Sequence, residues 1–316
     1  MCRLNDLLDE EKCYDEVRRI RWPYVVDCPR CGSNKVVKRG RNHRHRACRR
    51  YTCRNCEKRF DDLTGTIFMG RHQPLSVWFS YLYLMGLNQS NLQIAEELGL
   101  NESDGQWMAE QLREGIVKRR RTVRLSGKVE CDEVYIVAGH KGRADRIVGR
   151  PPRRRRLKGA PGRGTLAKDK PPIVGMIERG GEVRIVMLAD VKQRTIRPLI
   201  AETIEPGTLI NTDEYVIDDA LPAWGYPRKS VCHGRGEYAR DEDGDGFHEV
   251  HVNTMEGFWS LLRSWLRPHR GLSQEKFPLY LGFFEFVHNV RQRGRALLGA
   301  LLGTLLQPEA CPQNPQ

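Results

Sequence analysis

The chain contains the stretch His251-Val252-Asn253-Thr254-Met255-Glu256-Gly257-Phe258-Trp259-Ser260-Leu261-Leu262-Arg263. Its apolar residues recur at the spacing of one helix face, so the stretch predicts an amphipathic helix. Glu256 and Arg263 fall on a neighbouring polar stripe of that helix and project into the same space. Such a pair is most often an ordinary surface ion pair. Its meaning therefore depends on which other acidic side chains the fold brings close to Glu256.

An upstream segment supplies the first such acid. Residues 128–137 have the β-branched and aromatic content of a strand. Alternation along this strand places Glu130 and Asp132 on one face and Glu133 on the other. Asp132 is therefore a candidate partner of the helical acid.

A later strand supplies the second acidic side chain. A hairpin over 172–188 and a helix over 195–204 precede the strand 208–212, which ends on Asp213. One acid on the first strand and a second acid at the end of the fourth strand are typical of the ribonuclease-H-like arrangement. In that arrangement adjacent parallel strands bring the two Asp side chains together, and a helix supplies the third acid. The pattern predicts that Asp132, Asp213 and Glu256 converge.

The charge of the chain indicates its partner. Its 316 residues carry a net charge of +13, which favours binding to a polyanion, first of all nucleic acid. A basic protein with a merely solvated surface is the alternative. The first residues are charged rather than apolar, and the most apolar window, 75–87, is shorter than the roughly 20 residues of a membrane-spanning helix. We therefore expect a cytoplasmic protein with no membrane partner.

Cysteine spacing predicts a zinc site near the N-terminus. In a reducing compartment the ten cysteines favour metal ligation over disulfides. Two knuckles, Cys28-Pro29-Arg30-Cys31 and Cys53-Arg54-Asn55-Cys56, can place four thiolates around one structural Zn²⁺. Cys48 is the rival fourth ligand, with His43 and His45 as weaker rivals. Strands are expected over 35–40 and 49–52, and the loops hold six arginines that can grip phosphates: Arg39, Arg41, Arg44, Arg46, Arg49 and Arg50.

Two further segments are candidates for contact with DNA. Helices over 90–98 and 103–118, joined at a glycine, form a helix-turn-helix-like hairpin that either binds DNA or only packs. The segment 140–171 is basic and rich in Gly and Pro. Its central run Arg153-Arg154-Arg155-Arg156 is expected to be a solvated loop that can order itself on DNA.

Four motifs in order resemble those of the zinc-ribbon DDE transposases of bacterial insertion sequences, the group related to the Merlin elements. The motifs are the paired Cys-x-x-Cys knuckles, Cys131-Asp132-Glu133-Val134-Tyr135 with Gly139-His140-Lys141-Gly142, Thr212-Asp213-Glu214-Tyr215, and the stretch 251–263. The resemblance covers residues 25–293. It implies cleavage of DNA at the terminal inverted repeats of a mobile element and joining of those ends to target DNA.

The resemblance also implies site residues. Asp132 and Asp213 match the first two catalytic acids of the family. The third is either Glu or Asn in this family, so both Glu256 and Asn253 are candidates, and Glu256 is favoured because Arg263 follows it by seven residues. These side chains are expected to hold two catalytic Mg²⁺ ions, which Mn²⁺ can replace, for two-metal phosphoryl transfer. Arg263, His251 and Lys141 are candidates for contact with phosphates of the DNA.

We therefore predict a multidomain protein of mixed α+β and α/β class that acts as a homo-oligomer on DNA. The predicted parts are an N-terminal helix with a zinc ribbon (1–70), a helix-turn-helix-like segment (71–125), a ribonuclease-H-like catalytic domain (126–293) with a basic insertion (140–171), and a C-terminal tail (294–316). The apolar residues of the tail are expected to pack on the preceding helix or on a partner chain. A non-catalytic DNA-binding regulator and a nuclease that cleaves without joining are the alternatives.

Overall fold

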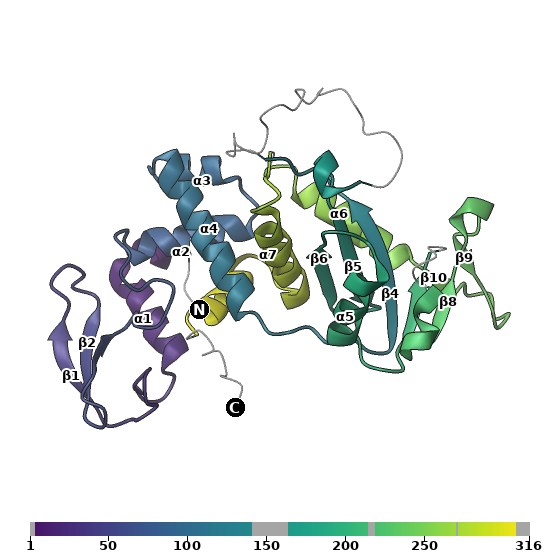
Figure 1. Ribbon diagram of the computed structural model, residues 1–316. Coiled ribbons are helices and arrows are strands. Elements are labelled where there is room, and N and C mark those ends of the chain that lie inside the picture. The colour runs from purple at the N-terminus through teal and green to yellow at the C-terminus, as the bar shows by residue number, and fades with distance from the viewer. Residues whose placement is uncertain (1–3, 141–163, 214–218, 270, 308–316) are drawn as a thin grey trace. The chain divides into compact units, whose positions relative to one another are not determined.

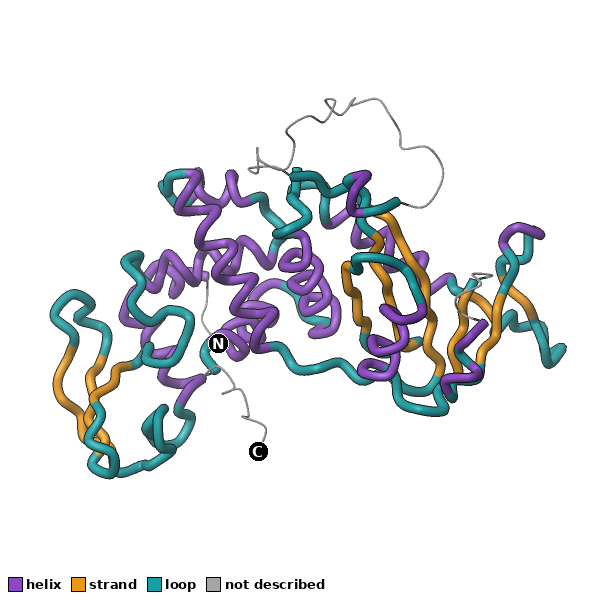
Figure 2. Tube along the Cα trace, viewed as in Figure 1, coloured by secondary structure: helices purple, strands orange, loops and turns teal. Residues whose placement is uncertain are grey.

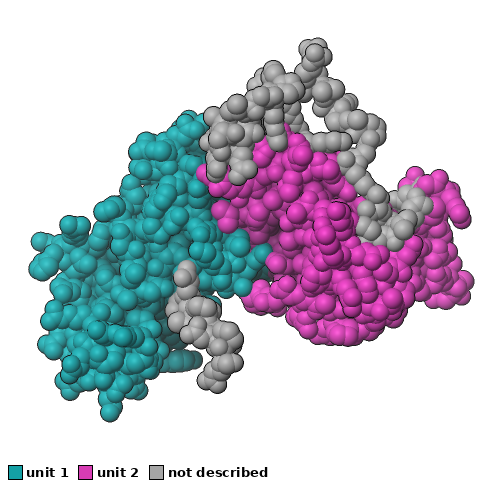
Figure 3. Space-filling model, viewed as in Figure 1, with its two compact units in different colours: residues 1–120, 290–316 teal, residues 121–289 magenta. Residues whose placement is uncertain are grey.

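The computed structural model describes residues 4–140, 164–213, 219–269 and 271–307. The chain forms two compact units, one of Met1–Arg120 with Val290–Gln316 and the other of Arg121–Asn289 (Figure 3). None of the described helices is both long and apolar enough to cross a membrane.

The first unit contains a small antiparallel sheet. Its strands are β1 (Val36–Arg41), β2 (Arg49–Cys53) and β3 (Arg59–Asp61), in the order β1-β2-β3. The sequence predicts the first two as a hairpin but not the third. Trp22, Tyr51 and Phe60 form the apolar centre of this part. The short helix η1 (Leu4–Leu8) and α1 (Glu10–Arg21) precede the sheet.

Four helices complete the first unit: α2 (Leu75–Gly86), α3 (Asn91–Glu97), α4 (Glu102–Arg119) and α8 (Gly294–Leu305). The side chains of Ser90 and Asn101 accept hydrogen bonds from backbone amides and so cap α3 and α4. The helices α3 and α4 cross closely because Gly105 of α4 lies against Ala95 of α3: a Cβ at Gly105 would come within 2.7 Å of the Ala95 Cβ. The hairpin has the predicted helix-turn-helix-like form. The apolar residues of α8 are expected from the sequence to pack on the preceding helix or on a partner chain, but α8 packs on α2 and α4 of its own unit.

The second unit is built on a five-stranded sheet (Figures 1 and 2). The strands are β4 (Lys128–Tyr135), β5 (Pro172–Glu178), β6 (Val183–Met187), β7 (Leu209–Thr212) and β8 (Arg228–Ser230), in the order β6-β5-β4-β7-β8. The pairs β4/β5 and β5/β6 are antiparallel, whereas β4/β7 and β7/β8 are parallel. This is the predicted ribonuclease-H-like topology, to which the structure adds β8.

Helices cover both faces of this sheet. On one face lies α5 (Gln193–Thr203), and on the other lie α6 (Asn253–Trp265) and α7 (Phe277–Val290). The paired strands β9 (Ala239–Arg240) and β10 (Val250–His251) lead into α6. Short 3-10 helices occur at Leu166–Lys168, Pro222–Trp224 and His233–Arg235. Helix α6 packs on the central strand β4 and on its neighbour β5.

Candidate active site

Strand β4 directs alternate side chains to opposite faces of the sheet, as its sequence predicts. Val129 and Cys131 pack in the core that includes α5. Asp132 faces α6 and accepts a hydrogen bond from the indole N–H of Trp259, with 2.9 Å between Nε1 and Oδ2. The backbone N–H of Glu133 donates to the other oxygen of Asp132 at 2.8 Å. Two donors therefore fix the orientation of this carboxylate.

Asp213 follows β7, the parallel neighbour of β4. In the register of the two strands, Glu130 lies opposite Asn211. Continuing this register by two residues on each strand brings Asp213 level with Asp132. The two carboxylates therefore lie at the same end of adjacent parallel strands.

Helix α6 supplies the third acid and has the predicted amphipathic pattern. Its buried residues are Met255, Phe258, Trp259 and Leu262. Glu256 is exposed in the first turn, one turn after the exposed Asn253 that begins the helix. Arg263 is exposed in the last turn. The helix thus presents Glu256 at the end that lies over the sheet acids.

A glycine of the sheet lets the helix come close. Gly175 of β5 lies opposite Asp132. A Cβ at Gly175 would lie 2.3 Å from Met255 Cε and 2.5 Å from Trp259 Cη2. Because any larger residue would meet these side chains, Gly175 sets how closely α6 approaches β4 and β5.

The electrostatics of Asp132 reflect its burial and the two nearby acids. The pKa of its carboxyl group is raised to about 6. Burial is the largest cause, and the hydrogen bond from Trp259 opposes it. The charges of Asp213 and Glu256 raise the pKa further, against the hydrogen bond from the Glu133 amide. Burial and two neighbouring negative charges thus both disfavour the ionised form of Asp132, and a bound cation would stabilise that form.

The donors of this site fit a hydrated divalent cation. Carboxylate oxygens are the ligands that Mg²⁺ and Mn²⁺ prefer, and Mg²⁺ keeps several waters when it binds. The buried side-chain amide of Asn211 has no hydrogen-bond partner in the described part of the chain. It lies two residues before Asp213, on the same face of β7. Since buried polar groups are normally paired, the water shell of an ion would suit this amide.

The sequence predicts that Glu130 lies on the same face of its strand as Asp132, but it indicates no role for Glu130. Its carboxylate is fully buried and accepts hydrogen bonds from Arg179, Thr254 and the backbone amide of Met255. The signal that could have found it was its position, because a charged residue on the buried face of a central strand needs partners.

The structure places the predicted phosphate-binding residues as follows. His251 lies with Nδ1 3.2 Å from the Glu130 carboxylate, and its pKa is lowered by burial and by the charge of Arg179, against the opposing charge of Glu130. Arg263 is exposed on α6. Lys141 and the run Arg153-Arg154-Arg155-Arg156 lie outside the described residues.

The four predicted zinc ligands come together in the first unit. The sulfur atoms of Cys28, Cys31, Cys53 and Cys56 all lie within 4.8 Å of one another. Two of the pairs, Cys28–Cys56 and Cys31–Cys53, are 3.6 Å apart. Sulfurs held tetrahedrally at about 2.3 Å from Zn²⁺ are roughly 3.8 Å apart, so the cluster fits a zinc ion. The rival Cys48 lies outside this group and is buried, which raises the pKa of its thiol to about 12.

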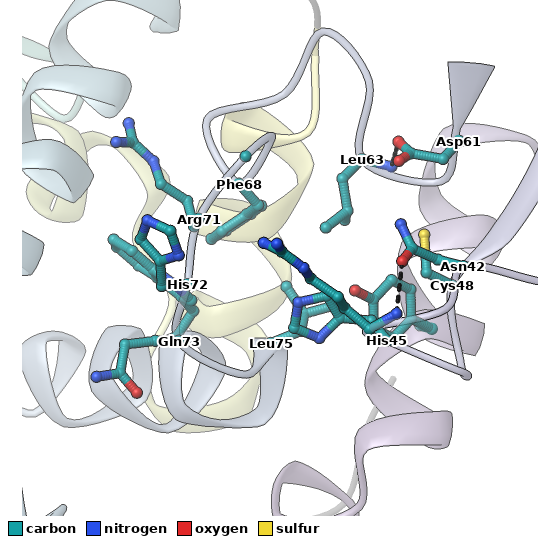
Figure 4. Close-up of a pocket in the computed structure, with 14 residues that line it drawn as sticks. Asn42, His45, Cys48, Asp61, Leu63, Phe68, Arg71, His72, Gln73 and Leu75 are labelled. Carbon is teal, nitrogen blue, oxygen red and sulfur yellow. Dashed lines mark hydrogen bonds between the residues drawn. The ribbon is translucent and has the colours of Figure 1, made fainter. Parts of the chain in front are cut away.

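A hollow of about 420 Å³ lies in the first unit (Figure 4). Its lining includes the ribbon residues Asn42, Arg44 and His45 and, from the segment before α2, Arg71 and His72. The Arg71 guanidinium stacks over the Trp107 ring at 4.7 Å and donates to Gln111, so its position is fixed. Asp61 also lines the hollow but accepts hydrogen bonds from Thr64 and the Leu63 amide. The lining therefore includes two arginines, Arg44 and Arg71, against one acid, Asp61.

Comparison with known families and relatives agrees with this geometry. Residues 124–289 match the ISXO2-like transposase domain, and residues 8–59 match a transposase zinc-ribbon domain. An uncharacterized protein in transposable element ISH50 of Halobacterium salinarum is 33% identical over 310 residues, which cover 97% of this chain and 100% of that protein. An uncharacterized transposase-like protein of Haemophilus influenzae is 24% identical over 108 residues, 34% of this chain and 81% of that protein.

Two solved structures are remotely similar. One is the simian T-cell lymphotropic virus intasome in complex with PP2A regulatory subunit B56 gamma, with a TM-score of 0.30, 13% identity, and coverage of 75% of this chain and 77% of that one. The other is a pre-cleavage Mos1 transpososome, with a TM-score of 0.25, 11% identity, and coverage of 72% and 74%.

Proposed function

The chain belongs to the ISXO2-like transposase family, and on this premise we propose that it cuts DNA at the ends of an insertion sequence and joins those ends to target DNA. The observation that carries this proposal is the convergence of Asp132, Asp213 and Glu256 from three separate elements. A site of this composition suits metal-dependent phosphoryl transfer.

The three acids would divide the work of holding metal. Asp132 and Asp213 would ligate two Mg²⁺ ions, and Glu256 would hold one of them. When bound, the ions activate the attacking oxygen and stabilise the leaving oxygen of the phosphodiester. Trp259 and the Glu133 amide keep the Asp132 carboxylate in one orientation, so that no rearrangement of this ligand is required.

The proposed reaction has two exchanges of phosphorus–oxygen bonds. In the first, water attacks the phosphodiester at the element end, which leaves a 3′-hydroxyl on the element and a 5′-phosphate on the flanking DNA. In the second, that 3′-hydroxyl attacks a target phosphodiester and displaces a target 3′-oxygen. Each step forms one bond and breaks one, so no external energy source is required.

Glu256 is proposed as the third acid in preference to Asn253. The charge of Glu256 reaches Asp132, where it raises the pKa. Asn253 is one turn nearer the start of α6, and its backbone N–H lies 3.3 Å from Nδ1 of His251. We propose that Asn253 positions DNA or a metal-bound water, and that Arg263, two turns after Glu256, contacts phosphate.

DNA is proposed to contact the zinc ribbon. The exposed arginines of its loops and first strand include Arg39, Arg41, Arg44 and Arg46. Arg44 also lines the cationic hollow, so a backbone phosphate can be held there. The first turn of α4, by contrast, carries Glu102 and Asp104, which repel phosphate. Binding by the α3–α4 hairpin would therefore use its basic end at Lys118 and Arg119.

The protein is proposed to act as a homo-oligomer on DNA. Both ends of an element have to enter one target, and each end needs a set of catalytic acids. The described residues of one chain gather one such set. At least two copies of the chain would therefore assemble on the two terminal inverted repeats.

The test is incubation of the purified protein with DNA that carries its flanking inverted repeats, together with a target plasmid. Wild type and Asp213→Asn are compared with Mg²⁺ and with EDTA. The proposal expects metal-dependent joined products that are lost in Asp213→Asn. Cleavage without joining would indicate a nuclease, and binding without chemistry would indicate a regulator; either result would overturn the proposal.

A further inference from the structure

Helix α6 begins without a cap of its own. Its N-cap residue, Val252, has an apolar side chain that accepts no hydrogen bond, yet the first backbone N–H groups of any helix need acceptors. The acceptor comes from the sheet: Glu130 Oε2 lies 3.0 Å from the backbone nitrogen of Met255. Glu130 Oε1 accepts from the hydroxyl of Thr254 at 2.9 Å. A carboxylate on β4 therefore caps the helix that carries Glu256.

Arg179 compensates the buried charge of Glu130. Its Nε lies 2.6 Å from Glu130 Oε1. Its two terminal nitrogens donate to the backbone carbonyls of Glu249 and His251, at 2.6 Å and 2.9 Å. The guanidinium thus holds the strand that leads into α6 as well as the carboxylate that caps it. An isolated carboxylate at this depth would be costly, so the two residues form one unit.

This unit connects two of the proposed catalytic acids over a short path. Glu130 and Asp132 are two residues apart on one face of β4, about 7 Å along the strand. Met255, whose amide Glu130 holds, directly precedes Glu256 in the chain. Glu130 therefore contributes, together with Trp259 and Gly175, to the position of Glu256 relative to Asp132.

We propose that the Glu130–Arg179 ion pair is a positioning device that fixes the third acid of the active site and thereby sets its affinity for divalent metal. Neither side chain touches the DNA or the metal in this role. The inference rests on the proposed function, because it assumes that Glu256 ligates metal. It goes beyond that function in assigning a task to two residues outside the acidic triad.

Glu130→Gln tests this role because each of the four groups around the carboxylate is a hydrogen-bond donor or can act as one. The neighbours are Arg179, Thr254, the Met255 amide and His251. A glutamine offers oxygen on one side only. Because glutamine is neutral, the ion pair with Arg179 is lost in either orientation of the amide, and its N–H₂ group also faces either Arg179 or the Met255 amide.

Glu285 provides a matched control in the same unit. It too is a buried glutamate that accepts from an arginine and a backbone amide through different oxygens: Oε1 lies 3.3 Å from Arg184, and Oε2 lies 2.9 Å from the amide of Ile185. These partners belong to β6 rather than α6. Glu285→Gln therefore removes a comparable set of interactions, but it leaves unchanged the contacts of Glu130 that hold the start of α6.

The experiment measures Mn²⁺ binding to the full chain by calorimetry and amide hydrogen exchange over residues 253–262. We expect Glu130→Gln to weaken Mn²⁺ binding about tenfold or more and to accelerate exchange at the start of α6. Glu285→Gln should lower the melting temperature but leave both readouts at wild-type values. Thr254→Val, which removes only one hydroxyl donor, should fold in any case and weaken Mn²⁺ binding about threefold.

Two results would overturn the inference alone. One is wild-type Mn²⁺ affinity and exchange in Glu130→Gln and Thr254→Val, in protein that still joins DNA ends. The other is an equal loss of affinity in Glu285→Gln. Failure of the wild-type chain to bind Mn²⁺ or to react would instead overturn the proposed function, and with it the metal part of this inference.

Discussion

The indole N–H of Trp259 on α6 donates to the carboxylate of Asp132 on β4, with 2.9 Å between Nε1 and Oδ2. This bond joins the helix that carries the third acid to the strand that carries the first. Trp259 is also a core residue of α6, so the same side chain packs the helix and orients a proposed metal ligand. Packing of α6 and orientation of the proposed metal ligand are therefore coupled at this position.

Trp259→Phe should remove this coupling. Phenylalanine keeps most of the apolar surface but has no donor, so Asp132 is held by the Glu133 amide alone. We expect Mn²⁺ affinity to fall about tenfold, as measured by calorimetry. Trp78→Phe is the control, because the buried Trp78 N–H has no hydrogen-bond partner among the described residues. Equal affinities in Trp259→Phe and the wild type would contradict this role.

Gly175→Ala should push α6 away from the sheet. Its new Cβ would meet Met255 and Trp259 at distances of 2.3–2.5 Å, so the helix or the strand must shift. Overpacking of this kind costs about 1–3 kcal/mol of the free energy of unfolding, measured with urea, and joining of DNA ends should fall with it.

Gly257→Ala is the contrasting substitution on the same helix. A Cβ at Gly257 would meet no atom within 4 Å. Because alanine favours helix over glycine, we expect a gain of about 0.5–1 kcal/mol. If Gly175→Ala were as benign as Gly257→Ala, the close approach of α6 to β5 would be refuted.

Removal of zinc should unfold the ribbon. Cys31→Ser removes one of the four clustered thiols, whereas Cys48→Ser removes a buried thiol outside the cluster. Metal analysis of the purified protein should find zinc in the wild type and Cys48→Ser and little in Cys31→Ser. Loss of zinc from Cys48→Ser, with retention in Cys31→Ser, would show that the ligands are assigned wrongly.

The ribbon arginines should govern the salt dependence of DNA binding. Arg44→Ala and Arg46→Ala should each weaken binding and reduce the slope of log K against log salt by about 0.9 for each phosphate that the variant no longer neutralises. Arg194→Ala, an exposed arginine of α5 on the sheet face away from the acids, is the control. An unchanged slope in both ribbon variants would place the DNA elsewhere.

Periodicity explains which parts of the site the sequence could predict. Apolar residues recur along 255–262 at helical spacing, and alternation along β4 separates Asp132 from Cys131, so the helix and the strand follow from local pattern. The parallel pairing of β4 with β7 followed from the order of elements between Asp132 and Asp213.

Other features depend on contacts between segments far apart in the chain. The strand β8, Arg228–Ser230, has three polar residues and becomes a strand only because β7 offers it a free edge. The cap of α6 by Glu130 spans 125 residues. In the sequence, Gly175 is simply one residue of an apolar strand. The close contact that requires a glycine there arises only when α6 packs over it. Local pattern contains no sign of such pairings.

We propose that Asp132, Asp213 and Glu256 form one metal-dependent site for joining DNA ends. The most direct measurement supplies a pre-cut terminal repeat with a free 3′-hydroxyl and a target plasmid in Mg²⁺, and follows joined product for Asp132→Asn, Glu256→Gln and Glu202→Gln. Glu202 is an exposed acid of α5 on the opposite face of the sheet. We expect Asp132→Asn and Glu256→Gln to bind the repeat but to form no joined product, while Glu202→Gln should join DNA ends as well as the wild type does. Joining at the wild-type rate by Asp132→Asn would contradict this proposal.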